Sequence, residues 1–117
     1  MNLLTSVVIV NFNAGDFLAA AVESALSQDG VVEVLVVDNH SNDGSVERLR
    51  DLMSGRPVEI ILLDANYGFA HACNLGAERA SGETLLFLNP DCRMKAGALT
   101  QMREALLMQP DAGMVGP

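Results

Sequence analysis

The segment Val34-Leu35-Val36-Val37-Asp38-Asn39-His40-Ser41-Asn42-Asp43-Gly44 decides the fold, because a run of apolar residues stops there at an acidic turn. A second apolar run, Leu85-Leu86-Phe87-Leu88, stops in the same way at Asn89-Pro90-Asp91. Such runs are typical of strands that are buried on both faces of a parallel sheet. Ligands of open parallel sheets bind in the crevice outside the carboxyl ends of the strands. We therefore expect the function of this chain at that edge.

Strand-like and helix-like segments alternate along the chain. Short apolar runs predict strands at 6–10, 31–37, 58–63 and 83–88. Apolar residues at helical spacing predict helices at 16–28, 46–53, 69–80 and 99–107. This alternation predicts one α/β domain over 1–117, with helices on both faces of a parallel sheet in the nucleotide-type order 3-2-1-4. Residues 111–117 look like the start of a fifth strand, so we expect the chain to be part of a longer protein.

The composition excludes several classes of function. The chain has 117 residues and a formal net charge of −8, which repels phosphate backbones and anionic lipid. We therefore expect no nucleic-acid partner, and no apolar stretch approaches the roughly 20 residues of a membrane-spanning helix. The start lacks a basic region and a cleavage site, which predicts a cytoplasmic location and leaves membrane association open for a full-length protein. Cys73 and Cys92 lack metal-type spacing, and we expect two reduced, buried thiols.

Two carboxylates at strand tips are the leading candidates for ligand contact. Asp38 ends the second strand, where its carboxylate can accept hydrogen bonds from a base or a ribose. Asn89 and Asp91 flank Pro90, which stiffens the tip of the fourth strand, and both carry hard oxygen ligands that suit Mg²⁺ or Mn²⁺. From the residues alone, ordinary turns whose side chains make only local hydrogen bonds explain both tips equally well.

Amide side chains accompany these carboxylates. Asn11 and Asn13 lie at the end of the first strand, where they can hydrogen-bond a nucleobase or cap the next helix. Asn66 and Gly68 lead into a helix whose free amides can face a phosphate, and Asn74 lies near the start of that helix. These residues extend the candidate site along the same edge.

Several familiar sites are missing. The sequence has no GxxxxGK[ST] phosphate loop, no strand-linked GxGxxG and no GxSxG nucleophile motif. His71, near the start of the third helix, fits a surface histidine better than a metal or phosphate ligand. The candidate ligand that remains is a diphosphate bridged to the protein by a metal.

Four motifs, in this order, resemble the family 2 glycosyltransferases, and most closely their rhamnosyltransferase-type members. They are Val7-Val8-Ile9-Val10-Asn11-Phe12-Asn13, residues 36–45, Asn66-Tyr67-Gly68-Phe69-Ala70 with Asn74, and residues 87–91. The match covers essentially the whole chain. It implies a Rossmann-like GT-A fold, a UDP- or dTDP-sugar donor, and a divalent ion, Mg²⁺ or Mn²⁺, that bridges the diphosphate.

The resemblance also implies a set of site residues. The substrate-binding positions that it carries over are Asn11, Asn13, Asp38, Asn39, Asp43, Gly44, Asn66, Gly68, Asn74 and Asn89. Among them, Asp38 matches the acid that contacts base or ribose. Asn89-Pro90-Asp91 occupies the position of the family's DxD metal motif, and because Asn89 replaces the first Asp, metal contact falls chiefly to Asp91.

Enzymes with this pattern usually invert the anomeric centre and use an acidic base from a later segment, which we expect beyond Pro117. The resemblance therefore implies the donor-binding half of a metal-dependent, inverting glycosyltransferase with a glycan acceptor. Two alternatives are a nucleotide-binding module without catalysis and a receiver-type signalling domain. The receiver fits poorly, because the first strand ends in Asn11 instead of an acid and the only lysine, Lys95, follows Asp91 closely.

Overall fold

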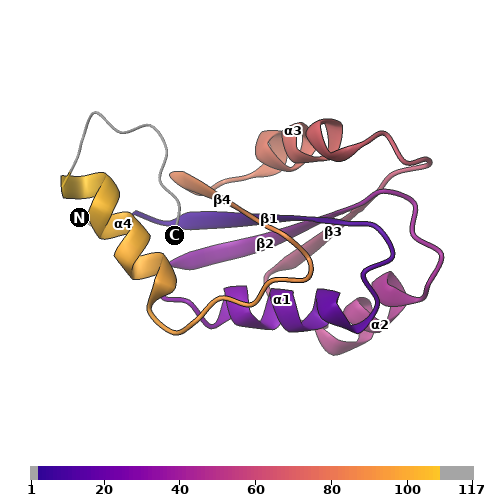
Figure 1. Ribbon diagram of the computed structural model, residues 1–117, viewed down its shortest axis with the longest axis horizontal. Coiled ribbons are helices and arrows are strands. Elements are labelled where there is room, and N and C mark those ends of the chain that lie inside the picture. Colours follow the sequence, from indigo (N-terminus) through magenta and orange to yellow (C-terminus); the bar gives the residue numbers. More distant parts are fainter. Residues whose placement is uncertain (1–2, 109–117) are drawn as a thin grey trace.

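Strands and helices alternate throughout the computed structural model, which describes residues 3–108 (Figure 1). The elements in chain order are β1 (Thr5–Asn11), α1 (Asp16–Leu26), β2 (Val31–Asp38), α2 (Ser45–Leu52), β3 (Val58–Leu62), α3 (Phe69–Arg79), β4 (Thr84–Leu88) and α4 (Ala98–Met108). The predicted α/β class is confirmed. The fifth strand expected at 111–117 lies outside the described residues.

The four strands form one parallel sheet in the order β3-β2-β1-β4, as predicted. Asn11, the last residue of β1, pairs with Asp38, the last residue of β2. On the other side of β1, Ile9 lies opposite Leu88 at the end of β4. The tips of β2, β1 and β4 therefore finish side by side at the carboxyl edge of the sheet, on the right in Figure 1.

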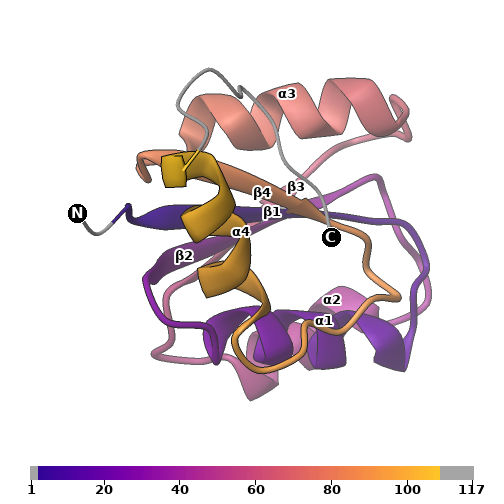
Figure 2. The same cartoon turned by 60° about the vertical axis from the view of Figure 1, so that its left-hand side comes forward.

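Helices cover both faces of the sheet: α1 and α2 lie on one face and α3 lies on the other (Figures 1 and 2). β1 is buried along its whole length, since it lies between two strands and two helix layers. Its side chains alternate between the layers. Val7 and Ile9 belong to the core under α1, whereas Val8 and Val10 belong to the core under α3.

A glycine lets α3 lie close to the sheet. A Cβ built at Gly76 would come within 2.5 Å of Val8 Cγ1 and 3.3 Å of Val37 Cγ2. The backbone of α3 thus occupies space that a side chain would need. This close approach sets the height of α3 above the sheet, and with it the position of the loop that precedes the helix.

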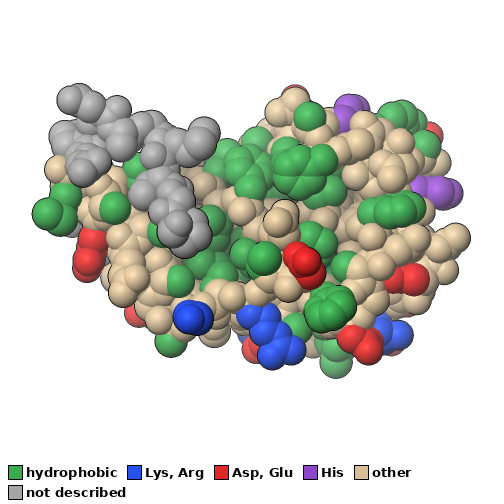
Figure 3. Space-filling view, in the orientation of Figure 1, with side chains coloured by type: hydrophobic (Ala, Val, Ile, Leu, Met, Phe, Trp, Pro, Cys, Tyr) green, Lys and Arg blue, Asp and Glu red, His purple; other side chains and the backbone are tan. Residues whose placement is uncertain are grey.

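β4 is the least covered strand. Leu85 and Phe87 are 42% and 48% exposed, and Figure 3 shows hydrophobic side chains gathered over β4 beside α3. α4 is tied instead to the start of β1, where Arg103 Nε donates a hydrogen bond to Thr5 Oγ1 at 3.2 Å. No helix within residues 3–108 has the length and apolarity needed to cross a membrane.

Some local predictions need correction. The element ends differ from the predicted ones by at most two residues, and β1 extends to Asn11, where the sequence predicted an end at Val10. The apolar spacing that predicts this helix also places Leu52 on its buried face, but Leu52 is 59% exposed, because α2 ends there and Met53 packs in the core. Both thiols are free, as predicted, yet Cys92 is exposed because it lies in the turn after β4, and Cys73 is only half-buried.

Candidate functional site

A buried hydrogen bond joins the tips of β1 and β2. Asn11 Nδ2 donates to Asp38 Oδ1 at 2.9 Å and to Ser45 Oγ at 3.0 Å. Asn11 is completely buried and Asp38 is 3% exposed. The parallel register places the two residues opposite each other, so the pair is a direct consequence of strand pairing. These two predicted site residues therefore hydrogen-bond to each other beneath the surface of the carboxyl edge. Contact of either residue with a ligand stays a prediction.

The loop between β2 and α2 closes over this pair. Ser41 donates hydrogen bonds to both oxygens of Asp38, from its backbone N–H to Oδ2 at 2.9 Å and from its hydroxyl to Oδ1 at 2.7 Å. The sequence predicted Ser41 only as a residue of the turn. The signal that could have identified it is its spacing, since a hydroxyl three residues after a strand-ending Asp suits this turn.

Asp43 ties the loop after β1 to the start of α2. Its Oδ2 accepts a hydrogen bond from Gly15 N–H at 2.8 Å, and its Oδ1 accepts from the backbone N–H and the hydroxyl of Ser45 at 3.0 and 2.6 Å. The hydroxyl of Ser45 is the main reason that the pKa of Asp43 lies below its usual value. Gly44, with φ of +83°, forms the N-cap of α2. Asp43 thus accepts the backbone N–H of Ser45, the first residue of α2, and ligand contact by Asp43 stays a prediction.

Asn39 holds the loop that precedes α3. It is 3% exposed, its Nδ2 donates to Gly68 O at 3.2 Å, and its Oδ1 accepts from Tyr67 N–H at 3.3 Å. Within the loop, Gly68 N–H donates to Asn66 Oδ1 at 2.9 Å. The structure therefore brings Asn66 and Gly68 next to the tip of β2, where both are exposed.

The start of α3 is open to solvent. Gly68, with φ of +91°, is its N-cap, and no side chain caps the helix. His71 and Asn74 are exposed, as expected for a surface histidine, and the His71 ring lies 5.0 Å from that of Tyr67. Figure 3 shows both histidines of the chain at the right-hand end of this face, where the strands finish.

Asn89 and Asp91 follow β4, next to the tip of β1. Both are exposed, and the Asp91 carboxylate has one close polar contact in the described structure, Cys92 Sγ at 3.7 Å from Oδ1. The carboxylate oxygens of Asp38 and Asp43 already accept hydrogen bonds from the protein, whereas those of Asp91 accept no backbone or side-chain N–H or O–H within the described residues. Within residues 3–108, no group of three His, Cys, Asp or Glu side chains could hold a metal by itself. A hard cation here would need oxygens from a ligand in addition to Asp91, as Mg²⁺ commonly does.

Phe12 is a candidate that sequence reasoning missed. It follows the last residue of β1 and is 51% exposed at the carboxyl edge. An exposed aromatic ring beside polar groups can stack on a nucleobase. The signal was present in the sequence, because Phe12 stands between the polar residues Asn11 and Asn13, outside the apolar run of the first strand.

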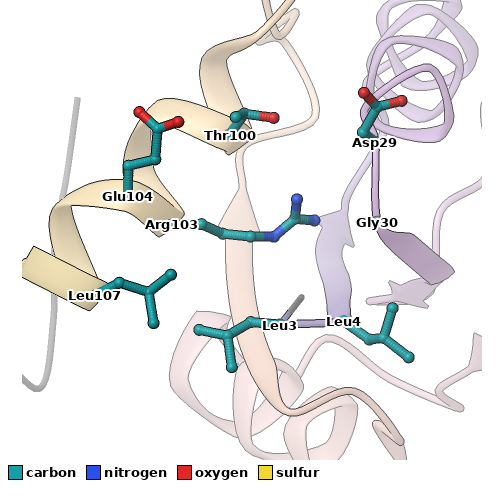
Figure 4. A pocket seen from close by; sticks show the side chains of 8 residues that line it. All are labelled: Leu3, Leu4, Asp29, Gly30, Thr100, Arg103, Glu104 and Leu107. Carbon is teal, nitrogen blue, oxygen red and sulfur yellow. The ribbon is translucent and has the colours of Figure 1, made fainter. Parts of the chain in front are cut away.

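A cavity of about 570 Å³ lies at the opposite, amino edge of the sheet (Figure 4). It is lined by Leu3, Leu4, Asp29, Gly30, Thr100, Arg103, Glu104 and Leu107. Arg103 supplies one positive charge, which the carboxylates of Asp29 and Glu104 oppose, and leucines line much of the rest. This combination suits a diphosphate poorly, so the carboxyl edge is the better candidate site.

Comparison with known proteins identifies the family. Residues 6–117 match the family model described as glycosyl transferase family 2. The chain is 37% identical over 98 residues to the succinoglycan biosynthesis protein ExoO of Rhizobium meliloti, covering 83% of this chain and 28% of ExoO. It is 31% identical over 106 residues to the putative teichuronic acid biosynthesis glycosyltransferase TuaG of Bacillus subtilis, covering 89% of this chain and 42% of TuaG.

Solved structures share the fold. Residues 1–349 of S. aureus TarS in complex with UDP-GlcNAc superpose with a TM-score of 0.79 at 20% identity, over 98% of this chain and 37% of that one. GalNAc-T7 with UDP, GalNAc and Mn²⁺ gives a TM-score of 0.80 at 24% identity, over 89% of this chain and 21% of that one. The implied GT-A fold is confirmed, and the receiver alternative is excluded. This chain belongs to the family 2 glycosyltransferases, and it spans 28% to 42% of the two curated relatives named above.

Proposed function

We propose that this chain binds the nucleotide diphosphate of a sugar donor across the tips of β2, β1 and β4. The observation that carries the proposal is the meeting of four polar loops at one edge of the sheet. The Asn11–Asp38 pair joins two tips at 2.9 Å, and Asn39 holds the loop before α3 beside them. Asp91 follows the neighbouring strand on the other side. The complex of UDP-GlcNAc with TarS, which has the same fold, supports this choice of ligand.

We assign the nucleoside to the tips of β1 and β2. Phe12 offers an exposed ring on which a uracil or thymine could stack, and Asn13 is an exposed amide in the same loop. The buried side chains beneath them, Asn11 and Asp38, keep this platform in place. UDP- and dTDP-sugars are therefore the donors to test first.

We assign the diphosphate to the side of β4. The exposed carboxylate of Asp91, with the side-chain oxygen of Asn89 nearby in sequence, forms a donor set that fits Mg²⁺ or Mn²⁺. When bound, a divalent ion supplies the positive charge that stabilises a departing diphosphate. GalNAc-T7, which has the same fold, was solved with Mn²⁺, and this supports a metal-dependent reaction.

In the full-length protein, the acceptor is a glycan hydroxyl, and an acidic base deprotonates it while the anomeric centre inverts. Relatives named for succinoglycan and teichuronic acid biosynthesis support a polysaccharide or similar glycan as the product. The chain covers less than half of those relatives, so we expect the 117 residues to bind the donor without efficient transfer. Robust transfer by this chain alone would contradict that expectation.

Calorimetric titration with UDP, dTDP and GDP, each with and without Mn²⁺, tests the donor site. We expect binding that depends on Mn²⁺ and is lost in Asp91→Ala. Asp29→Ala is the matched control, since it removes an aspartate from the cavity at the amino edge. If Asp29→Ala abolishes binding and Asp91→Ala does not, the nucleotide binds at the amino edge of the sheet, and the proposed site at the carboxyl edge is wrong. If the folded chain binds no nucleotide, the proposal fails altogether.

A further inference from the structure

We infer that Ser41 is a positioning residue of the donor site, which holds the loop after β1 and the carboxylate of Asp38 in the arrangement that binds the nucleotide. This inference rests on the proposed function. Ser41 lies in the loop between β2 and α2 and is half-buried. It acts through its neighbours, because hydrogen bonds to Asp38, Asn13 and Asn11 take up its hydroxyl.

The hydroxyl of Ser41 uses its full hydrogen-bonding capacity. It donates to Asp38 Oδ1 at 2.7 Å and accepts from Asn13 N–H at 2.9 Å and from Asn11 Nδ2 at 3.2 Å. A serine hydroxyl has one donor and two acceptor positions, so none remains for a ligand. Asn11 Nδ2 has two hydrogens for three acceptors, so its bond to Ser41, the longest of the three, is shared with the others.

Ser41 also decides where Asn13 lies. Asn13 has a φ of +52°, in the left-handed region that costs most residues energy and that Asn tolerates better than others. Ser41 Oγ accepts from its backbone N–H, and Asn13 Oδ1 accepts from Asn42 N–H at 2.9 Å. Two adjacent residues of one loop therefore hold Asn13 from its backbone and from its side chain.

These contacts span elements far apart in the chain. Asn13 and Ser41 are 28 residues apart in the chain, so the hydrogen bond between them connects the loop after β1 to the loop after β2. Strand pairing already holds Asn11 opposite Asp38, but it stops at that pair. Beyond the strand ends, the hydroxyl of Ser41 aligns the two loops together with the Asn42–Asn13 and Gly15–Asp43 hydrogen bonds. Removing it should disturb the nucleoside platform while leaving the sheet intact.

The test compares Ser41→Ala, Ser41→Thr and Ser41→Val with the control Ser54→Ala, which removes an exposed hydroxyl in the turn after α2. Thr keeps the hydroxyl, and Val has the shape of Thr without it. We expect Ser41→Ala and Ser41→Val to weaken UDP or dTDP binding about tenfold, roughly the effect of one lost hydrogen bond. Ser41→Thr should bind within about twofold of the unmodified chain, as should Ser54→Ala.

Amide hydrogen exchange gives a readout that does not depend on the nucleotide. We expect faster exchange of the Asn13 amide in Ser41→Ala and Ser41→Val, but not in Ser41→Thr or Ser54→Ala. Equal nucleotide affinity of the Thr and Val variants would overturn the inference, as would unchanged exchange at Asn13. If the unmodified chain binds no nucleotide, the proposed function fails, and that result is distinct from failure of the Ser41 inference.

Discussion

Replacing Gly76 with alanine should destabilise the protein, although alanine is the better helix former. Gly76 lies in the middle of α3, where a Cβ would come 2.5 Å from Val8 Cγ1 and 3.3 Å from both Val8 Cγ2 and Val37 Cγ2. Ordinary contacts between carbon atoms are about 3.5 to 4.0 Å. The nearest contact is thus short by roughly 1 Å, and α3 or Val8 must move.

The expected loss in the free energy of unfolding depends on how far the side chains that face Gly76 can move. Val8 is 1% exposed in the central strand, and its branched side chain has few alternative rotamers. Overpacking of this kind costs about 1 to 3 kcal/mol, and we expect the upper end because three contacts are too close. Alanine recovers about 1 kcal/mol of helix propensity relative to glycine. The net loss in the free energy of unfolding should be roughly 2 kcal/mol.

Urea denaturation of Gly76→Ala, Val8→Ala and the double variant measures this coupling. Val8→Ala alone should cost roughly 2 kcal/mol, because it leaves a gap in the core. It also removes two of the three methyl groups that the new Cβ would meet, including the nearest one, and leaves Val37 Cγ2. The double variant should therefore lose about 1 to 2 kcal/mol less than the sum of the single losses. Strict additivity, or a Gly76→Ala variant as stable as the unmodified chain, would refute the reasoning.

Two further predictions concern titratable groups. Burial raises the pKa of Glu33, but hydrogen bonds from Ser6 and Ser81 outweigh it, so the folded-state pKa lies below the usual 4.5. The stabilising contribution of Glu33 should be full above about pH 4.5 and should be lost as pH drops through the lower folded-state pKa. The free energy of unfolding, measured by denaturation, should therefore fall less steeply with acid in Glu33→Gln. The same acid dependence in the variant and the unmodified chain would count against this. Cys92 is exposed, whereas burial raises the pKa of Cys73, so a thiol reagent near neutral pH should label Cys92 first. Cys92→Ser should abolish the fast phase, and its persistence would contradict the assignment.

The fold was predictable because its signals are local. Alternating apolar runs and helical spacing depend on near neighbours in the chain, so they place each strand and helix within a residue or two. The run before Asp38 also predicted burial on both faces, which β2 shows along its second half. Leu52 shows the limit of this reasoning, because its exposure depends on where α2 stops, and periodicity defines helix ends poorly.

The candidate site was predictable as a set of residues but not as an arrangement. Asp38 and Asn11 stood out in the sequence as polar groups at strand ends. Their pairing depends on the register between β1 and β2, which the sequence of neither strand contains. The same holds for Asn39, whose side chain is buried against a loop that follows it by almost 30 residues.

By itself, the sequence determined the α/β class, the family, and the edge of the sheet that carries the polar residues. Only the tertiary structure decided which of those residues hold one another and which face outward. Asn11, Asp38 and Asn39 are buried, while Asp91 is exposed. The physical reason is that hydrogen bonds between strand tips form only after the sheet has assembled. The role of a polar side chain then depends on the partners that assembly brings to it.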